Sequence, residues 1–363
     1  MTVVWTVDLI ELCLGQSSNR SVDFPIYAML ERVRSQRTIA RPSIGQTEPA
    51  GNRSLSPFSI MSAKLTFNTD MTFSYGEPAP MAPGVQRIVA NNPGPFTFKG
   101  TNTYLVGTET LAVIDPGPDD PAHRDAILAA AKGRPITHVL ITHTHRDHVD
   151  GLAALQEATG ARSYGYGRRQ FATQMKGTSP SGTEFIDQDF APDVVVQDGD
   201  VISGPDWALL GLYTPGHAPD HLCFELRDQG VIFSGDHVMG WNTTVIAPPE
   251  GHMASYLASL ERLLERQGEI YLPGHGGQIE TPQRAVKAYL LHRQWREQAV
   301  LRAVRGGVGS IRDIVRLIYP DLSDKLITAA SLSVQAHVEH LMDKGEIEKQ
   351  TPLDFDTPLS ARA

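Results

Sequence analysis

The chain has 363 residues, of which 41% are hydrophobic and 20% are charged, and such a composition is typical of a globular enzyme. Its length suits one large domain or a catalytic domain with a smaller appendage. The formal net charge is −9, so the chain as a whole repels polyanions, and nucleic-acid binding would require a local basic patch.

Membrane insertion and export are both disfavoured by the sequence. No stretch offers the roughly 18 unbroken apolar residues of a membrane span, so we expect no membrane partner. Residues 3–14 are apolar, but Asp8 and Glu11 interrupt them and no basic residue precedes them, unlike in a secretory signal. The cysteines, Cys13 and Cys223, exclude a disulfide framework and suit a reducing compartment. We therefore predict a cytoplasmic protein.

The N-terminal part has the weakest pattern. From Gln16 to about Ser59 the chain is rich in Ser, Arg, Pro and Gly and lacks sustained periodicity. This composition predicts an irregular or disordered extension over residues 1–60. The first convincing strand is expected over residues 85–89.

Strands and helices alternate after this point. Strands are expected at 104–106, 111–114 and 138–142, and helices at 121–131 and 152–158. A second strand-rich stretch follows, with strands at 194–196, 207–213, 222–226 and 231–233, a helix at 254–266 and a strand at 270–272. Two β-rich halves that carry helices predict a layered α/β sandwich.

The C-terminal part is predicted to be mainly helical. A long helix is expected at 282–304, shorter helices at 311–318, 325–330 and 334–344, and a small strand at 345–349. Helices followed by a hairpin are typical of a winged-helix module. We therefore predict a catalytic domain with a trailing helix over 61–305, a small winged-helix-like α domain over 306–352, and a tail over 353–363.

A cluster of metal-ligand residue types lies where the strand predicted at 138–142 ends. His143, His145, Asp147 and His148 fall within six residues. Alternate side chains of an extended segment share a face, so the first three can converge, and the following turn brings His148 beside them. Imidazole and carboxylate groups suit Zn²⁺, Fe²⁺ or Mn²⁺.

Three later turns add further candidate ligands. They are Thr214-Pro-Gly-His217, Ser234-Gly-Asp236 and Pro273-Gly-His275. Each follows a predicted strand, and each contains a glycine that lets the backbone approach a shared centre. A solvated loop explains one isolated histidine, but four ligand-rich segments at strand ends indicate a metal site.

The order H-x-H-x-D-H, Gly-His, Gly-Asp and Gly-His resembles the metallo-β-lactamase superfamily over about residues 85–278. The resemblance implies that family's αββα sandwich and two divalent metal ions, with Zn²⁺ expected ahead of Fe or Mn. It implies that His143, His145 and His217 hold the first ion, that Asp147, His148 and His275 hold the second, and that Asp236 bridges them.

Two further residues are expected to support these ligands without binding metal. Asp115, in Val-Ile-Asp-Pro-Gly, matches the family's early aspartate behind the metal loop, although a plain turn aspartate explains it nearly as well. His221, which follows His217 in Gly-His-Ala-Pro-Asp-His, matches a second histidine with a supporting role. His237 is expected near the site because it follows Asp236, and His252 is expected to be incidental.

The segments Asn92-Pro-Gly-Pro, Gly100-Thr-Asn-Thr-Tyr-Leu-Val106 and His292-Arg-Gln-Trp-Arg-Glu297 are similar to the branch named for β-lactamase-like protein 2. Members of that branch end in a winged-helix-like domain. Its animal member is a mitochondrial endoribonuclease on single-stranded RNA, and related fungal proteins are thioesterases of carrier-bound polyketides. The resemblance therefore leaves the substrate open.

The expected activity is hydrolysis by a hydroxide shared between two metal ions, because paired cations acidify water and polarise the scissile bond. Asp147 is also a candidate to relay a proton to the leaving group. The expected substrate is a small molecule or acyl group, namely a thioester, a lactone or another small ester.

Two alternatives remain open at this point. An endoribonuclease on single-stranded RNA is favoured by a basic, aromatic-bearing helix, although the same residues suit a solvated face with its aromatic side chains in the core. These residues are Arg284, Lys287, Tyr289, Arg293, Trp295, Arg296, Arg302 and Arg305. A non-enzymatic DNA-binding metal or metabolite sensor is disfavoured by Glu339 and Asp343 in the last predicted helix. The winged-helix-like domain would then serve packing, substrate capping or formation of a homodimer.

Overall fold

The computed structural model describes residues 67–167, 186–320, 322, 324–349 and 352–362. The extension predicted over residues 1–60 lies outside these ranges. Within the described residues, no helix combines the length and the apolar character needed to cross a bilayer.

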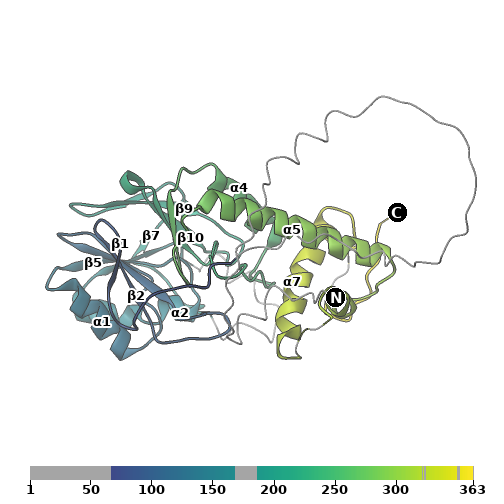
Figure 1. Ribbon diagram of the computed structural model, residues 1–363, viewed down its shortest axis with the longest axis horizontal. Coiled ribbons are helices and arrows are strands. Elements are labelled where there is room, and N and C mark those ends of the chain that lie inside the picture. The colour runs from purple at the N-terminus through teal and green to yellow at the C-terminus, as the bar shows by residue number, and fades with distance from the viewer. Residues whose placement is uncertain (1–66, 168–185, 321, 323, 350–351, 363) are drawn as a thin grey trace, which may run out of the picture. The chain divides into compact units, whose positions relative to one another are not determined.

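Two sheets form the centre of the fold (Figure 1). The first sheet has seven strands in chain order: β1 (Ala79–Ala82), β2 (Val85–Val89), β3 (Asn102–Val106), β4 (Leu111–Ile114), β5 (Ile136–Leu140), β6 (Arg162–Gly165) and β7 (Val194–Val195). Its first four strands pair antiparallel, and β4 to β7 pair parallel.

The second sheet has five strands in the order β12-β11-β10-β9-β8. They are β8 (Val201–Ser203), β9 (Ala208–Tyr213), β10 (Leu222–Leu226), β11 (Val231–Gly235) and β12 (Ile270–Pro273). Neighbours pair antiparallel, except β11 and β12, which are parallel. A 3-10 turn, Arg227–Gln229, joins β10 to β11.

Helices cover the outer faces of both sheets. The first sheet packs against α1 (Pro121–Ala131) and α3 (Leu152–Thr159), and the second against α4 (Met253–Leu264) and the first part of α5 (Pro282–Arg305). Apolar side chains of both sheets, including Tyr104, Phe224 and Phe233, fill the space between them. The predicted αββα sandwich is therefore confirmed.

The helix α1 has the bounds predicted from sequence, because its start carries a local signal. Asp120 accepts a hydrogen bond from the backbone N–H of Ala122, and Pro121 occupies the first turn, where a missing N–H is harmless. The strand β5, by contrast, ends at Leu140 and not at the expected residue 142. The N–H of Thr142 donates to the Asp115 carboxylate and leaves the ladder.

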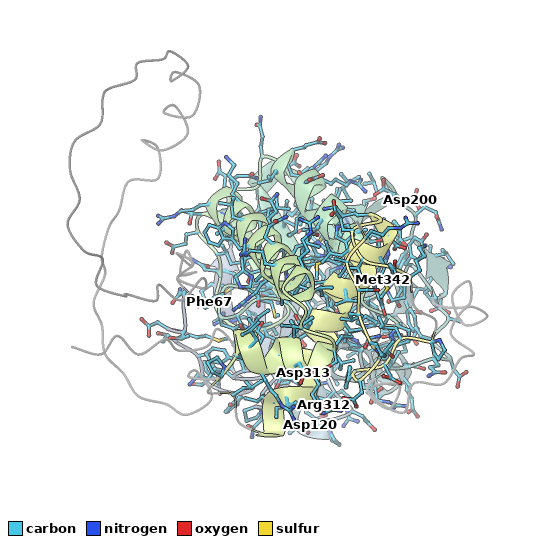
Figure 2. The ribbon with its side chains drawn as sticks, turned by 90° about the vertical axis from the view of Figure 1, so that its right-hand side faces the viewer. Phe67, Asp120, Asp200, Arg312, Asp313 and Met342 are labelled. Atoms are coloured by element: carbon cyan, nitrogen blue, oxygen red, sulfur yellow. The ribbon has the colours of Figure 1, made fainter. Side chains whose placement is uncertain are left out.

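The C-terminal domain contains the end of α5, α6 (Ile311–Ile318) and α7 (Asp324–Asp343) around one apolar cluster. Figure 2 labels Arg312 and Asp313 of α6 and Met342 of α7. The prediction of two helices over 325–330 and 334–344 was wrong, because α7 is continuous. No Gly or Pro interrupts this stretch, and its middle is buried at Ser331 and Val334, so packing stabilises one helix.

The strand predicted at 345–349 reduces to a single bridge between Ile347 and Ala361. Its partner therefore comes from the residues predicted as a tail. Leu359 is buried in the same cluster, and Arg312 of α6 pairs with Asp356 at 2.7 Å. The last described residues thus belong to the packing of this domain.

Candidate metal centre

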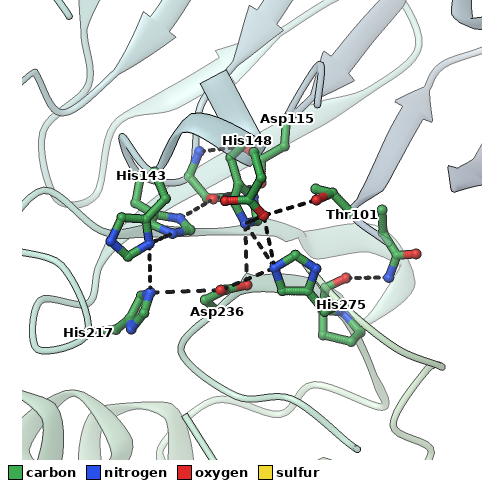
Figure 3. A network of polar contacts seen from close by, with 12 residues as sticks. Thr101, Asp115, His143, His148, His217, Asp236 and His275 are labelled. Atoms are coloured by element: carbon green, nitrogen blue, oxygen red, sulfur yellow. Dashed lines mark hydrogen bonds and ion pairs between the residues drawn. The ribbon is translucent and has the colours of Figure 1, made fainter. Parts of the chain in front are cut away.

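All seven predicted ligands lie in connections that follow strands. Figure 3 labels His143, His148, His217, Asp236 and His275 among them. His143 and His145 follow β5, and α2 (Arg146–Val149) carries Asp147 and His148. The remaining three residues, His217, Asp236 and His275, follow β9, β11 and β12. The sandwich brings these loops together at one edge of its two sheets.

The first group consists of His143, His145, His217 and Asp236, whose candidate ligand atoms lie within 4.8 Å of one another. The Nδ1 atom of His145 lies 2.9 Å from His143 Nε2 and 3.1 Å from His217 Nε2. Asp236 Oδ2 lies 3.8 Å from His217 Nε2. These are the residues expected around the first ion.

The second group consists of Asp147, His148 and His275 and obeys the same 4.8 Å limit. His275 Nε2 lies 3.2 Å from Asp147 Oδ2 and 3.3 Å from His148 Nε2. Asp236 also faces this group, because its Oδ2 lies 3.3 Å from His275 Nε2 and its Oδ1 lies 3.6 Å from His148 Nε2. The carboxylate of Asp236 therefore lies between the two groups.

Contacts to the outer ring nitrogens orient three of these imidazoles. His148 Nδ1 contacts Asp115 Oδ2 at 2.9 Å. His217 Nδ1 contacts the carbonyl of Val245 at 2.7 Å, and His275 Nδ1 contacts the carbonyl of Gly100 at 3.3 Å. A carbonyl oxygen accepts only, so Nδ1 of His217 and of His275 carries a proton, and Nε2 of all three rings faces inward. His145 has the reverse orientation, with Nε2 located 3.8 Å from Glu250 Oε2.

This arrangement fits divalent cations. Inward-facing imidazole nitrogens approach one another to between 2.9 and 3.3 Å, and their lone pairs repel unless a proton or a cation lies between them. Asp236 Oδ1 is buried and has no hydrogen-bond partner among the described residues. A buried acceptor without a donor is costly, and a cation beside it removes that cost. Nitrogen and carboxylate donors in this combination suit Zn²⁺, Fe²⁺ or Mn²⁺.

The two groups differ in their protonation. Burial and the neighbouring His145 lower the pKa of His217 to about 4, so this ligand is neutral at pH 7. Burial also acts to lower the pKa of His148, but the carboxylates of Asp147, Asp236 and Asp115 raise it to about 9. Cation binding in the second group therefore releases protons at neutral pH.

Asp115 and His221 both support the ligand loops. The Asp115 carboxylate accepts from the Thr142 N–H at 2.8 Å and from its hydroxyl at 2.7 Å, in addition to contacting His148. This side chain therefore anchors the metal loop and does not merely cap its own turn. His221 Nε2 accepts from the backbone N–H of Asp236 at 3.2 Å, and this residue belongs to neither ligand group.

Other residues of the site had weaker signals in the sequence. The Thr101 hydroxyl donates to Asp147 Oδ2 at 3.0 Å, and Glu250 approaches His145 from a loop that showed no motif. His237, expected near the site, is fully buried between the rings of His221 and Tyr256. His252 is exposed and caps α4 by accepting from Ser255.

Comparisons with known proteins agree with this geometry. Residues 96–275 match the metallo-beta-lactamase superfamily, and residues 310–352 match the beta-lactamase associated winged helix domain. A beta-lactamase domain protein from Burkholderia ambifaria has the same fold, with a TM-score of 0.67 and 21% identity over 81% of this chain and 96% of that chain.

Three curated relatives extend the comparison. The lactamase-like protein adaB of Aspergillus niger is 31% identical over 251 residues, 67% of this chain and 72% of that protein. A beta-lactamase-like protein 2 homolog of Drosophila melanogaster is 29% identical over 283 residues, 74% of this chain and 91% of that protein. An atrochrysone carboxyl ACP thioesterase of Aspergillus fumigatus is 34% identical over 234 residues, 62% of this chain and 66% of that protein.

The matches span about two thirds of the fungal relatives' own length. The residues matched to the superfamily include every segment that supplies a candidate ligand, and the residues matched to the winged helix domain follow them in the chain. The chain therefore belongs to the metallo-β-lactamase superfamily and carries that superfamily's associated winged-helix domain at its C-terminal end.

Proposed function

We propose that this protein, a hydrolase of the metallo-β-lactamase superfamily, cleaves an acyl thioester, a lactone or another small ester at the paired His/Asp centre. One observation carries the proposal: two ligand groups adjoin one another and share the buried carboxylate of Asp236. The thioesterase from Aspergillus fumigatus supports a thioester as the first choice.

The proposal includes two divalent ions. His143, His145 and His217 would hold one, Asp147, His148 and His275 would hold the other, and Asp236 would contact both. When bound, such ions supply Lewis-acid polarisation of a carbonyl and acidify water, which yields the hydroxide nucleophile expected from the sequence. The protein's part is to aim the ligand nitrogens inward, which the contacts of Asp115, Val245 and Gly100 achieve.

Asp147 has the best position to move a proton. Its side chain is 27% exposed, compared with 9% for Asp236 and 2% for Asp115. Burial acts to raise its pKa, but the adjacent His148 and His275 lower the pKa well below its ordinary value, so the carboxylate is ionised. Its Oδ2 faces His148 and His275, so Oδ1 would accept a proton from water and pass it to a leaving thiolate or alkoxide.

An RNA substrate receives less support from the geometry. Tyr289 and Arg293, expected on a basic and aromatic surface, are 3% exposed. Arg305 at the end of the helix pairs with Glu346 at 2.7 Å. The exposed basic residues that remain along α5 are too few to form a continuous track for a phosphate backbone.

A DNA-binding sensor is also disfavoured, because α7 is buried on more than one side. Ala336 packs into the core of the second sheet's outer face, and Val338 and Leu341 pack into the C-terminal cluster. A helix that reads a DNA groove needs a free face with basic residues.

The deciding experiment compares substrates on the full chain after chelation and reloading with Zn²⁺, Mn²⁺ or Fe²⁺. We expect about two ions per chain and metal-dependent cleavage of an acyl-N-acetylcysteamine thioester. A lactone and single-stranded RNA are assayed in parallel. Cleavage of RNA without cleavage of either ester would overturn the acyl assignment, and absence of specific metal binding would overturn the centre itself.

A further inference from the structure

The segment His292-Arg-Gln-Trp-Arg-Glu297 lies in the middle of α5, where the long helix passes from the catalytic fold to the C-terminal domain. Two of its charged residues are buried, Arg293 at 3% exposure and Glu297 at 7%. Placing charged side chains in a protein interior is unfavourable unless they make specific polar contacts. Their contacts therefore indicate what the segment does.

Arg293 contacts the connection that carries two parts of the metal centre. Its Nη2 donates to the carbonyl of Thr244, and its guanidinium lies 5.3 Å from the centroid of the Tyr256 ring. The connection runs from β11 to α4, begins with the shared ligand Asp236, and includes Val245, whose carbonyl orients His217.

This connection forms no helix or strand between Asp236 and Val245, so side chains must satisfy its buried carbonyls. The Tyr256 hydroxyl donates to the carbonyl of His237 at 3.1 Å, and the Tyr289 hydroxyl contacts the carbonyls of Met239 and Asn242. With Arg293, three side chains of α4 and α5 thus hold four carbonyls of one segment.

Thr244 is the point where these contacts reach the ligands. Its hydroxyl contacts the carbonyls of Asp236 at 2.8 Å and His237 at 3.0 Å, while its own carbonyl accepts from Arg293. The next carbonyl, that of Val245, contacts His217 Nδ1 at 2.7 Å. The two carbonyls belong to adjacent peptide units, so a shift of the backbone at Thr244 and Val245 displaces the contacts of Asp236 and His217 together.

We propose that Arg293 is a positioning residue of the metal centre: it fixes the Thr244–Val245 peptide and thereby the geometry of Asp236 and His217. The inference rests on the proposed function only in taking these two residues as metal ligands. The substrate plays no part in it.

Glu297 provides a matched control because it lies one turn further along the same helix and faces the other domain. Its carboxylate pairs with Lys344 at 2.6 Å and with His340 at 3.2 Å, both at the end of α7 or just beyond it. Removing this carboxylate weakens the contact between α5 and α7 without touching the ligand-bearing segment. Arg302, exposed on the same helix, is the surface control.

The test measures metal affinity by competition with a chelator, and the absorption spectrum of the Co²⁺-loaded protein, for Arg293→Gln, Arg293→Lys, Glu297→Gln and Arg302→Gln. We expect Arg293→Gln to weaken binding of at least one ion by about 10- to 100-fold, the usual effect of losing a group that orients a ligand. Its Co²⁺ spectrum should change as well. Arg293→Lys should regain part of the affinity, since lysine donates but lacks the planar fork.

Glu297→Gln is expected to lower the melting temperature and to keep the parental affinity and Co²⁺ spectrum, and Arg302→Gln should change none of the three. Parental affinity and spectrum in Arg293→Gln, with only a lower melting temperature, would overturn the proposal. If Arg293→Gln does not fold, parental affinity in Arg293→Lys would overturn it, and intermediate affinity would support it. Because turnover is not measured, a wrong substrate assignment cannot mimic either result.

Discussion

The substitution Gly274→Ala tests how little space the metal centre leaves for a change of shape. Gly274 precedes His275, and a Cβ atom at this position would lie 2.5 Å from Asp236 Oδ1 and 2.7 Å from His148 Cε1. The backbone of Gly274 does not have the positive φ that favours glycine, so alanine can adopt its conformation. The added methyl group therefore acts through its volume alone.

The size of the effect follows from these distances. Real Cβ contacts are essentially never below 3.0 Å and are ordinary from 3.4 Å, so Asp236 must withdraw by about 0.5 to 0.9 Å and His148 by about 0.3 to 0.7 Å. A displacement on the order of 1 Å in an active site costs about 10²-fold in rate. The accompanying overpacking costs about 1–3 kcal/mol, which is a tolerable fraction of the stability of a domain.

The assay compares metal affinity, melting temperature and turnover of Gly274→Ala with those of the parent and of Gly309→Ala. Gly309 has open space where a Cβ atom would lie and no positive φ, so its substitution should leave all three unchanged or raise stability slightly. We expect Gly274→Ala to fold, to bind metal more weakly and to lose about 10²-fold in turnover. Parental metal affinity and turnover in this variant would refute the geometry.

Three further substitutions have defined outcomes. Asp236→Asn should lower the metal stoichiometry and reduce turnover by orders of magnitude with little change in melting temperature of the metal-free protein, and two bound ions with near-parental turnover would contradict the shared ligand. Thr101→Val removes the 3.0 Å contact to Asp147 and should weaken metal binding about 10-fold in chelator competition, whereas unchanged affinity would show that the contact is dispensable. Burial lowers the pKa of His123 from 6.5 to about 4. As the pH falls from 6.5 to 4, the imidazole is therefore protonated in the unfolded chain before it is protonated in the folded chain, and the free energy of unfolding falls by up to about 3 kcal/mol. In urea unfolding at pH 7 and pH 4.5, the free energy of unfolding should fall less between the two pH values in His123→Gln than in the parent. An equal fall in both proteins would argue against the lowered pKa of His123.

Features that depend on neighbouring residues were predictable from the sequence. Periodicity located the strands β4 and β10 and the helix α1. The ligand-type residues follow strands because strands that run in the same direction end at the same edge of a sheet. The segment that contains His143 and His148 is compact enough to suggest its convergence without knowledge of the fold. The turns that contain His217 and His275 were candidates because each follows a predicted strand, but their assignment to separate ions required the resemblance to a family.

Contacts between distant segments left no such trace. Thr101 and Asp147 are 46 residues apart, and neither residue type nor spacing connects them. The winged-helix domain is confirmed, but the strand predicted at 345–349 reduces to one bridge for the same reason, since the partner of Ile347 is Ala361, beyond a stretch that resembles a tail. A strand needs a second segment that pairs with it, and here that segment contributes a single bridged residue, Ala361.

In the basic helix α5, the spacing of the residues along the helix determines which of them are buried, and residue type does not. Arginine and tyrosine in α5 suggested a surface for RNA, yet Val286, Tyr289, Arg293, Glu297, Val300 and Val304 recur every three or four residues and form one buried face. Such spacing is that of an apolar stripe facing a core. Charged residues at two places in the stripe then require polar partners inside the protein. Thr244 and Lys344 supply these partners on opposite sides of the domain boundary, so the helix that joins the domains also contacts the segment bearing Asp236.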